Sequence, residues 1–203
     1  MKHRSLFSDP RFYFCLLILV IGASANFYSS ALIQQLFPYR LPIQDTLFQI
    51  LPYWPWTQNW SDWANIFSIL LLIVYLFPKR SRLVPFVMLS FGVGYFLRSI
   101  LILLNPFGGP LGNVTHYGLT TVEQHGQFPS GHIFLVTLVY FIIHRDERML
   151  KQLALVSIFI EIAALLLSHG HYSIDIVGGL FLGYFVAHSL QPYETSLSIK
   201  SAN

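Results

Sequence analysis

Residues 83–104 read LVPFVMLSFGVGYFLRSILILL, an apolar block with a single charged residue, Arg98. A helix needs about 20 mainly apolar residues to cross the hydrocarbon core of a bilayer, so this block is long enough for one crossing. Similar apolar blocks lie on both sides of it, at about 11–31, 61–77, 131–143, 152–168 and 174–190. The sequence therefore predicts an all-α integral membrane bundle of six transmembrane helices.

The composition agrees with a membrane protein. Of the 203 residues, 54% are hydrophobic and only 10% are charged, whereas soluble domains carry about 25% charged residues. Six spans leave no room for a separate soluble domain, so we expect a single domain, 1–203, with its functional core at about 83–190. The single cysteine, Cys15, excludes an intrachain disulfide and a Cys-based metal site. No basic tract suggests a nucleic-acid partner.

The positions of the basic residues predict the orientation. Three connections, at about 32–60, 105–130 and 169–173, contain only Arg40. Such an asymmetry follows the positive-inside rule, so we expect both termini to be cytoplasmic and these three connections to face the exoplasm, the periplasm or a lumen. Ten basic residues lie in the N-terminal arm, the other connections and the tail: Lys2, Arg4, Arg11, Lys79, Arg80, Arg82, Arg145, Arg148, Lys151 and Lys200.

The beginning of the chain also resembles a signal peptide. A basic arm and an apolar run precede Ala23-Ser24-Ala25, which is typical of a cleavage site. The apolar character continues to Leu32, past that site, so we expect the first span to be retained. Cleavage would leave the orientation of the other spans unchanged.

The connection at 38–60 is rich in proline and tryptophan. Its prolines exclude a regular helix or a central strand, and its tryptophans suit the headgroup layer of a membrane. We expect an interfacial anchor loop, and a lid over a lipid-binding groove is the alternative. The residues concerned are Pro38, Pro42, Pro52, Pro55, Trp54, Trp56 and Trp60.

A polar segment, His125-Gly-Gln-Phe-Pro-Ser-Gly-His132, lies where the connection at 105–130 reaches the next span. Ser130 suits the N-cap of that helix, and free backbone N–H groups at a helix start favour a bound phosphate. His132 then falls in the first helical turn, beside any anion bound there. We therefore predict that the start of this helix, at Ser130 and Gly131, favours a phosphate, with His132 beside it.

A second polar segment, Ser168-His-Gly-His-Tyr-Ser-Ile-Asp175, leads into the last span. His171 and Asp175 are four residues apart and would share one face of a helix. A carboxylate beside an imidazole selects its tautomer and raises its basicity, which makes the other ring nitrogen a better nucleophile. We expect His171 and Asp175 to form such a pair, and His169 is the weaker candidate.

Two further ionisable residues lie within apolar blocks, where a charge is costly. Arg98 lies in the outer half of its span and needs an anionic partner, either Asp175 or a lipid phosphate. The predicted topology brings Arg98 to the same side of the membrane as His132, His171 and Asp175, although their segments are distant in sequence. Glu161 lies in the middle of its span, and the sequence assigns it no role.

These motifs resemble a known family. Pro129-Ser-Gly-His132 and His171-Tyr-Ser-Ile-Asp175 resemble the second and third signatures of the type-2 phosphatidic acid phosphatase superfamily, and the latter is similar to the His-Tyr-Thr-x-Asp of its sphingomyelin synthase-like branch. The resemblance covers about residues 40–190. The Lys-x6-Arg-Pro signature of the phosphatase branch, and the Ser-Arg pair ahead of its last histidine, have no counterpart here. Two other stretches also resemble the synthase-like branch: Leu41-Pro-Ile-Gln-Asp45 with Leu51-Pro52, and Leu97-Arg-Ser-Ile100 with Asn105-Pro106.

The resemblance implies a phosphatidic acid phosphatase type-2 core and a lipid phosphotransferase that moves a phospho-headgroup between lipids through a phosphohistidine. It implies that His171 is the nucleophile, oriented by Asp175, and that His132 is the general acid and then the base. Phospholipid or sphingolipid within the membrane is the expected partner, and no metal or other cofactor is implied. The substrate would be held by Arg98, Ser130 and Gly131.

Two alternatives stay open. In a lipid phosphate phosphatase, water would replace the lipid acceptor. In a non-enzymatic transporter, the His, Asp and Arg side chains would form a relay, which should thread the membrane midplane instead of gathering at one surface. The sequence does not indicate the headgroup, the acceptor or the oligomeric state.

Overall fold

The computed structural model describes residues 9–77, 80–110 and 126–194. Within these ranges the secondary structure is helical, apart from one isolated bridge between Pro42 and Gly108. The prediction of an all-α protein is therefore confirmed. Of the residues used above, five lie outside the described residues: Lys2, Arg4, Lys79, His125 and Lys200.

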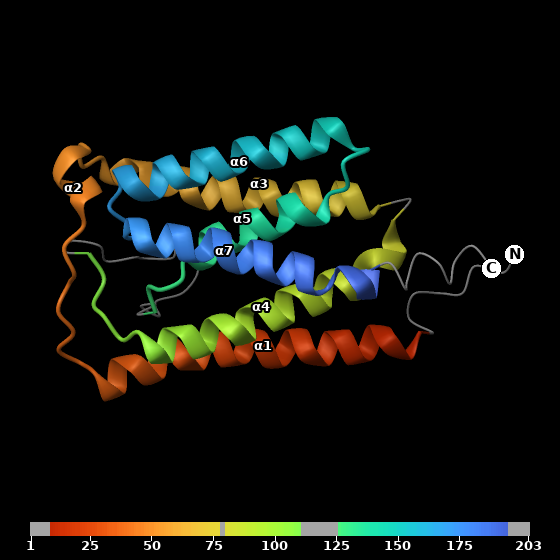
Figure 1. Cartoon of the computed structure of the whole chain (residues 1–203), viewed down its shortest axis with the longest axis horizontal. Helices are drawn as coiled ribbons and strands as arrows, with labels where there is room; N and C mark the ends of the chain where they lie inside the picture. Colours follow the sequence, from red (N-terminus) through yellow and green to blue (C-terminus); the bar gives the residue numbers. More distant parts are fainter. Residues whose placement is uncertain (1–8, 78–79, 111–125, 195–203) are drawn as a thin grey trace, which may run out of the picture.

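Each expected apolar block coincides with one helix. Figure 1 shows these helices side by side, with consecutive ones running in opposite directions. The helices are α1 (Pro10–Leu36), α3 (Gln58–Leu76), α4 (Val84–Leu104), α5 (Gly131–Ile142), α6 (Arg148–Leu167) and α7 (Ser173–Ser189). Three short elements lie in the connections: α2 (Thr46–Ile50), η2 (Pro55–Thr57) and η3 (Ser81–Leu83).

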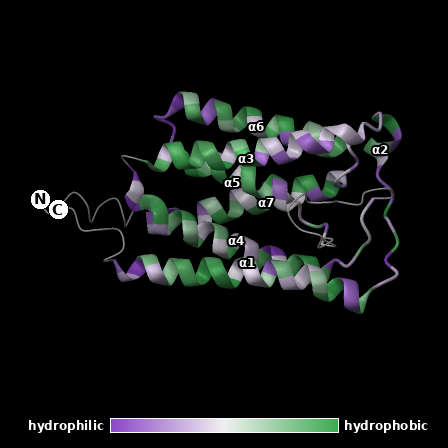
Figure 2. Cartoon of the chain, turned by 180° about the vertical axis from the view of Figure 1, so that it is seen from behind, coloured by the Kyte–Doolittle hydropathy of each residue, from purple (hydrophilic) through white to green (hydrophobic). Residues whose placement is uncertain are grey.

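Four segments are long and apolar enough to cross a membrane: Pro10–Leu36, Pro55–Leu76, Ser81–Leu104 and Arg148–Leu167. Helices α5 and α7 are apolar but shorter. At 1.5 Å per residue, α5 is only about 18 Å long, against about 30 Å of hydrocarbon. Apolar residues fill the middle of the helices, and polar ones gather toward their ends (Figure 2). The chain is thus a multi-pass membrane protein, and the count of six crossings stays a prediction.

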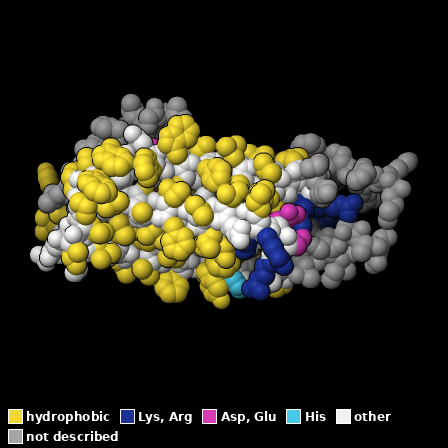
Figure 3. Space-filling model, turned by 90° about the horizontal axis from the view of Figure 1, so that it is seen from above, with side chains coloured by type: hydrophobic (Ala, Val, Ile, Leu, Met, Phe, Trp, Pro, Cys, Tyr) yellow, Lys and Arg dark blue, Asp and Glu magenta, His cyan; other side chains and the backbone are white. Residues whose placement is uncertain are grey.

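The outer surface of the bundle is apolar. Figure 3 shows hydrophobic side chains over most of the length of one face, with the visible basic side chains gathered toward one end. In water, contiguous apolar surface of this extent would promote association. Lipid tails would cover it instead. Large exposed side chains on α1, α6 and α7 include Phe14, Leu17, Val20, Phe159, Phe181 and Phe185.

Helix α5 lies at the centre of the bundle. It contacts α3, α4, α6 and α7, and Phe134, Leu138 and Ile142 are almost completely buried within the main hydrophobic core. Because its neighbours enclose it, α5 is held in one rotation and one depth. Its first turn, which begins at Gly131, is therefore placed by packing along the whole helix.

Helices α1 and α4 meet through glycine. A Cβ atom added to Gly22 would lie 2.0 Å from the carbonyl oxygen of Gly92, and one added to Gly92 would lie 2.7 Å from backbone atoms of Ile18. Only small residues permit two helix backbones to approach so closely, as is common between membrane helices. This contact sets the position of α4, which carries Arg98.

The connection between α1 and α3 is fastened to the beginning of α7. The Tyr172 hydroxyl accepts a hydrogen bond from the Ile43 N–H and donates one to the Gly108 carbonyl, both at 3.1 Å. Burial raises the pKa of the Tyr172 phenol, so it stays protonated and able to donate. Asp45 accepts a hydrogen bond from the Ser173 N–H at 2.5 Å. The connection thus reaches the residues next to His171.

Candidate active site

The start of α5 is held by its own cap and by α7. The Ser130 side chain accepts a hydrogen bond from the Ile133 N–H at 3.4 Å, which makes Ser130 the N-cap, as the sequence predicts. The Ser130 N–H donates to the backbone carbonyl of Asp175 at 3.0 Å. The two polar segments are therefore joined directly, and His132 lies in the first turn of α5.

His171 and Asp175 form the expected contact by a different route. His171 precedes α7, whose N-cap is Tyr172, so the two residues do not share a helix face. Asp175 turns back to the helix start, and its Oδ2 accepts from the Tyr172 N–H at 3.0 Å. The same oxygen lies 3.2 Å from His171 Nδ1. A proton on Nδ1 would leave the lone pair of Nε2 free to act as a nucleophile.

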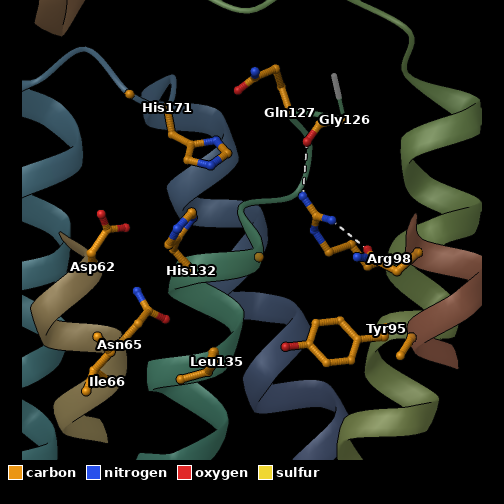
Figure 4. Close-up of a pocket in the computed structure, with 14 residues that line it drawn as sticks. Asp62, Asn65, Ile66, Tyr95, Arg98, Gly126, Gln127, His132, Leu135 and His171 are labelled. Atoms are coloured by element: carbon orange, nitrogen blue, oxygen red, sulfur yellow. Dashed lines mark hydrogen bonds between the residues drawn. The ribbon is translucent and has the colours of Figure 1, made fainter. Parts of the chain in front are cut away.

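The two histidines face one cavity. Their ring centroids are 5.9 Å apart, with the ring planes inclined at 64°. The cavity has a volume of about 510 Å³. Figure 4 shows His132 and His171 next to each other on its wall. Asp175 is completely buried behind His171. An imidazole held by a carboxylate therefore shares one space with a second imidazole, an arrangement suited to nucleophilic attack combined with proton transfer.

Arg98 reaches the same cavity from α4. Its guanidinium donates hydrogen bonds to the carbonyl oxygen of Pro129 at 2.7 Å, to that of Gly126 at 3.0 Å and to Asn26 Oδ1 at 2.6 Å. Figure 4 shows the bond to Gly126. These bonds hold its charge beside the start of α5. Within the described part of the chain, Asp175 makes no hydrogen bond to Arg98. Of the two anionic partners that the sequence left open for Arg98, Asp175 is therefore not the one that the structure provides.

The remaining predicted residues differ in their access to the cavity. Gly131 lines it, and a Cβ atom at this position would lie 3.2 Å from Cζ of Arg98. Ser130 is completely buried, and its hydroxyl serves the cap. His169 stacks on Phe48, with centroids 4.1 Å apart, and does not line the cavity. Of the predicted residues, His132, His171, Arg98 and Gly131 therefore line the cavity, whereas Asp175 and Ser130 are buried next to it.

Several residues of the cavity were not singled out from the sequence. Asp62 and Asn65 of α3, Tyr95 of α4 and Asn26 of α1 line it. Asp62 had a signal that was available, because a carboxylate within an apolar block is costly and often functional. The other three are uncharged, so the cost of burying a charge does not mark them in the sequence.

Glu161 has a structural partner. It is completely buried, and its Oε1 accepts a hydrogen bond from the Ser61 hydroxyl at 2.5 Å, which links α6 to α3. It does not line the cavity. Among the described residues, no group of three or more His, Cys, Asp and Glu side chains could hold a metal ion.

Comparison with known proteins supports the same family. Residues 128–191 match the family described as PAP2 superfamily C-terminal. The chain is 25% identical, over 197 residues, to phosphatidylcholine:ceramide cholinephosphotransferase 2 of Caenorhabditis elegans, covering 79% of this chain and 58% of that protein. It is 26% identical, over 224 residues, to phosphatidylcholine:ceramide cholinephosphotransferase 1 of the same organism, covering 92% and 48%.

The chain spans about half the length of these curated relatives. The family match includes both polar segments, Pro129-Ser-Gly-His132 and His171-Tyr-Ser-Ile-Asp175. The comparisons agree with the resemblance found in the motifs: residues 128–191 are similar to the PAP2 superfamily C-terminal family, and the chain is similar to two cholinephosphotransferases.

Proposed function

We propose that this protein is a membrane lipid phosphotransferase that moves a phospho-headgroup from a phospholipid to the hydroxyl group of a second lipid. The observation that carries the proposal is the pair of histidines, 5.9 Å apart on one cavity, with Asp175 at Nδ1 of His171. The similarity to phosphatidylcholine:ceramide cholinephosphotransferases supports it and suggests phosphatidylcholine as donor and ceramide as acceptor.

The first half of the reaction transfers the headgroup to the protein. Nε2 of His171 attacks phosphorus, a P–N bond forms and the P–O bond to the diacylglycerol oxygen breaks. His132 gives its proton to that oxygen, which would otherwise leave as an unstable alkoxide. Asp175 stabilises the charge that develops on the His171 ring. The products are diacylglycerol and a headgroup ester of phosphohistidine.

The second half reverses these roles. The acceptor hydroxyl attacks phosphorus, His132 takes its proton, and the P–N bond to His171 breaks. Arg98 and the backbone N–H groups at the start of α5, near Ser130 and Gly131, stabilise the negative charge on the phosphoryl oxygens in both steps. Atoms and protons balance, because the proton that His132 gives in the first half returns in the second.

We also propose that residues 1–203 form one domain with a catalytic core at about 83–190. Its chain would cross the membrane six times, with both termini in the cytoplasm. The alternation of basic and non-basic connections supports this arrangement, and it puts the cavity on the exoplasmic, periplasmic or luminal side. The short α5 would start below the membrane surface, which a site enclosed by protein permits.

A donor and acceptor assay in membranes tests the function. Headgroup-labelled phosphatidylcholine is supplied with ceramide, with diacylglycerol or with water alone. We expect label in a new lipid product when ceramide is present, and no new labelled lipid with water alone. His171→Ala should lower the rate by at least about 1000-fold, as loss of a nucleophile does. The matched control is His188→Ala, which removes a histidine at the other end of α7. Full activity in His171→Ala would contradict the proposal, and phosphate release from phosphatidic acid would support a phosphatase.

A further inference from the structure

One carboxylate on the cavity wall has no place in this mechanism. Asp62 of α3 lines the cavity, with Asn65 about one helical turn further along. In Figure 4 the Asp62 side chain extends toward the space beside His132. Its carboxylate makes no hydrogen bond or ion pair with any other described residue. A charge next to a membrane interior is costly, so an acid in this position calls for a partner.

The direction of Asp62 follows from the packing of α3 on α6. The Thr57 hydroxyl contacts the Ala164 carbonyl at 3.1 Å, and the Ser61 hydroxyl contacts Glu161 at 2.5 Å. These bonds fix the rotation of α3 with Ser61 toward α6. The next residue is turned by about 100° around the helix axis. Asp62 is therefore held away from α6 and toward the cavity by bonds it does not itself make.

The cavity has opposite charges on its two sides. Figure 4 shows Asp62 on one side of the two histidines and Arg98 on the other. A zwitterionic headgroup, with its phosphate near Arg98 and its ammonium group near Asp62, would pair with both side-chain charges when the cavity is closed off from water. A headgroup with a phosphate but no cation would leave the Asp62 carboxylate unpaired and repelled by the phosphate, which selects against such lipids.

We infer that Asp62 is a specificity residue that receives the ammonium group of the donor headgroup and so sets the preference for donors with a cation over donors without one. This inference rests on the proposed function. If Asp62 instead acted as a base on the acceptor hydroxyl, its loss would slow transfer from every donor. The two roles are therefore separated by comparing donors with and without a cation.

The first experiment measures kcat/KM with phosphatidylcholine and with phosphatidylglycerol, whose headgroup has no cation. In Asp62→Asn we expect kcat/KM for phosphatidylcholine to fall about 10- to 100-fold, the range for losing one charged partner. The value for phosphatidylglycerol should stay unchanged or rise, which also shows that the variant folds. Asp62→Glu should retain most of the preference. The control is Asp146→Asn, the same change at the opposite end of the bundle. Equal losses with both donors would overturn the inference.

A binding experiment separates this inference from the proposed function. His171→Ala protein in detergent is titrated with hexyl phosphocholine or with hexyl phosphate, and its thermal stabilisation is measured. Stronger binding of hexyl phosphocholine that disappears on adding Asp62→Asn would support the role of Asp62 even if the wild-type protein transferred no headgroup. An unchanged preference in that double variant would overturn the role of Asp62 and leave the transferase intact.

Discussion

At the scale of single residues, the contact between His171 and Asp175 depends on how α7 begins. Asp175 is the third residue of the helix, and its carboxylate caps the Tyr172 N–H at 3.0 Å. The cap fixes the carboxylate, and His171 then lies against the same oxygen at 3.2 Å. One side chain therefore stabilises the helix end and orients the proposed nucleophile.

Asp175→Asn should separate these two roles. An amide oxygen can still accept from the Tyr172 N–H, but it cannot stabilise a positive charge on the His171 ring. We expect transfer to fall by about 100- to 10,000-fold, with little change in the melting temperature. Activity and thermal unfolding in detergent are the two measurements. A loss of stability that matched the loss of activity would contradict the separation.

At the scale of helices, the contact of α1 with α4 positions Arg98. The helices approach through Gly22 and Gly92, and Asn26, about one turn after Gly22, accepts a hydrogen bond from the Arg98 guanidinium at 2.6 Å. The Arg98 guanidinium also lies against Gly131 of α5. A shift of α1 would therefore move one of the groups that hold Arg98 beside the cavity.

Gly92→Leu tests this contact. A Cβ atom alone would come within 2.7 Å of the backbone of Ile18, so α1 must move. We expect about 1–3 kcal/mol of destabilisation, as for other overpacked interiors, together with lower activity. Thermal unfolding in detergent measures the change. Ala163→Leu, on the exposed face of α6, is the control and should be neutral. Equal stability of the two variants would refute the proposed role of this contact.

At the scale of the whole molecule, the cavity and the basic connections lie at opposite ends of the bundle. The cavity residues His132 and His171 come from the starts of α5 and α7 (Figure 1). At the other end, Arg80 pairs with Asp146 at 2.6 Å and joins the connection before α4 to the one before α6. By the positive-inside rule, the end with the basic connections faces the cytoplasm, and the proposed orientation rests on this.

Single cysteines test that orientation. In a Cys15→Ala background, Tyr39→Cys should react with a membrane-impermeant maleimide applied from the side of the cavity, since Tyr39 is 96% exposed. Arg145→Cys and Pro192→Cys, both at exposed positions, should react only after permeabilisation. These two sites follow α5 and α7, the helices whose crossing is in question. Labelling of either one without permeabilisation would contradict the proposed arrangement of six crossings with cytoplasmic termini.

Much of the architecture could be predicted because it depends on local composition. Each apolar block between polar connections coincides with one helix, and these helices are α1, α3, α4, α5, α6 and α7. The N-cap at Ser130 could be predicted because its hydrogen bond joins a side chain to a backbone N–H only three residues further along. The residues His132, His171 and Asp175 could be predicted as site residues because their short motifs need no knowledge of distant contacts. The sequence placed the two histidines on the same side of the membrane, but it did not predict that their rings lie close together.

The sequence by itself determined which segments are helices, which ends are basic and which histidines carry the motifs. Only the tertiary structure decided that Arg98 is held by the carbonyls of Gly126 and Pro129, and that Asp62 turns toward the cavity. The physical reason is that a membrane helix is apolar on the side that meets lipid and on the side that meets protein. Its rotation therefore leaves little periodic trace in the sequence, and contacts such as that of Ser61 with Glu161 set it.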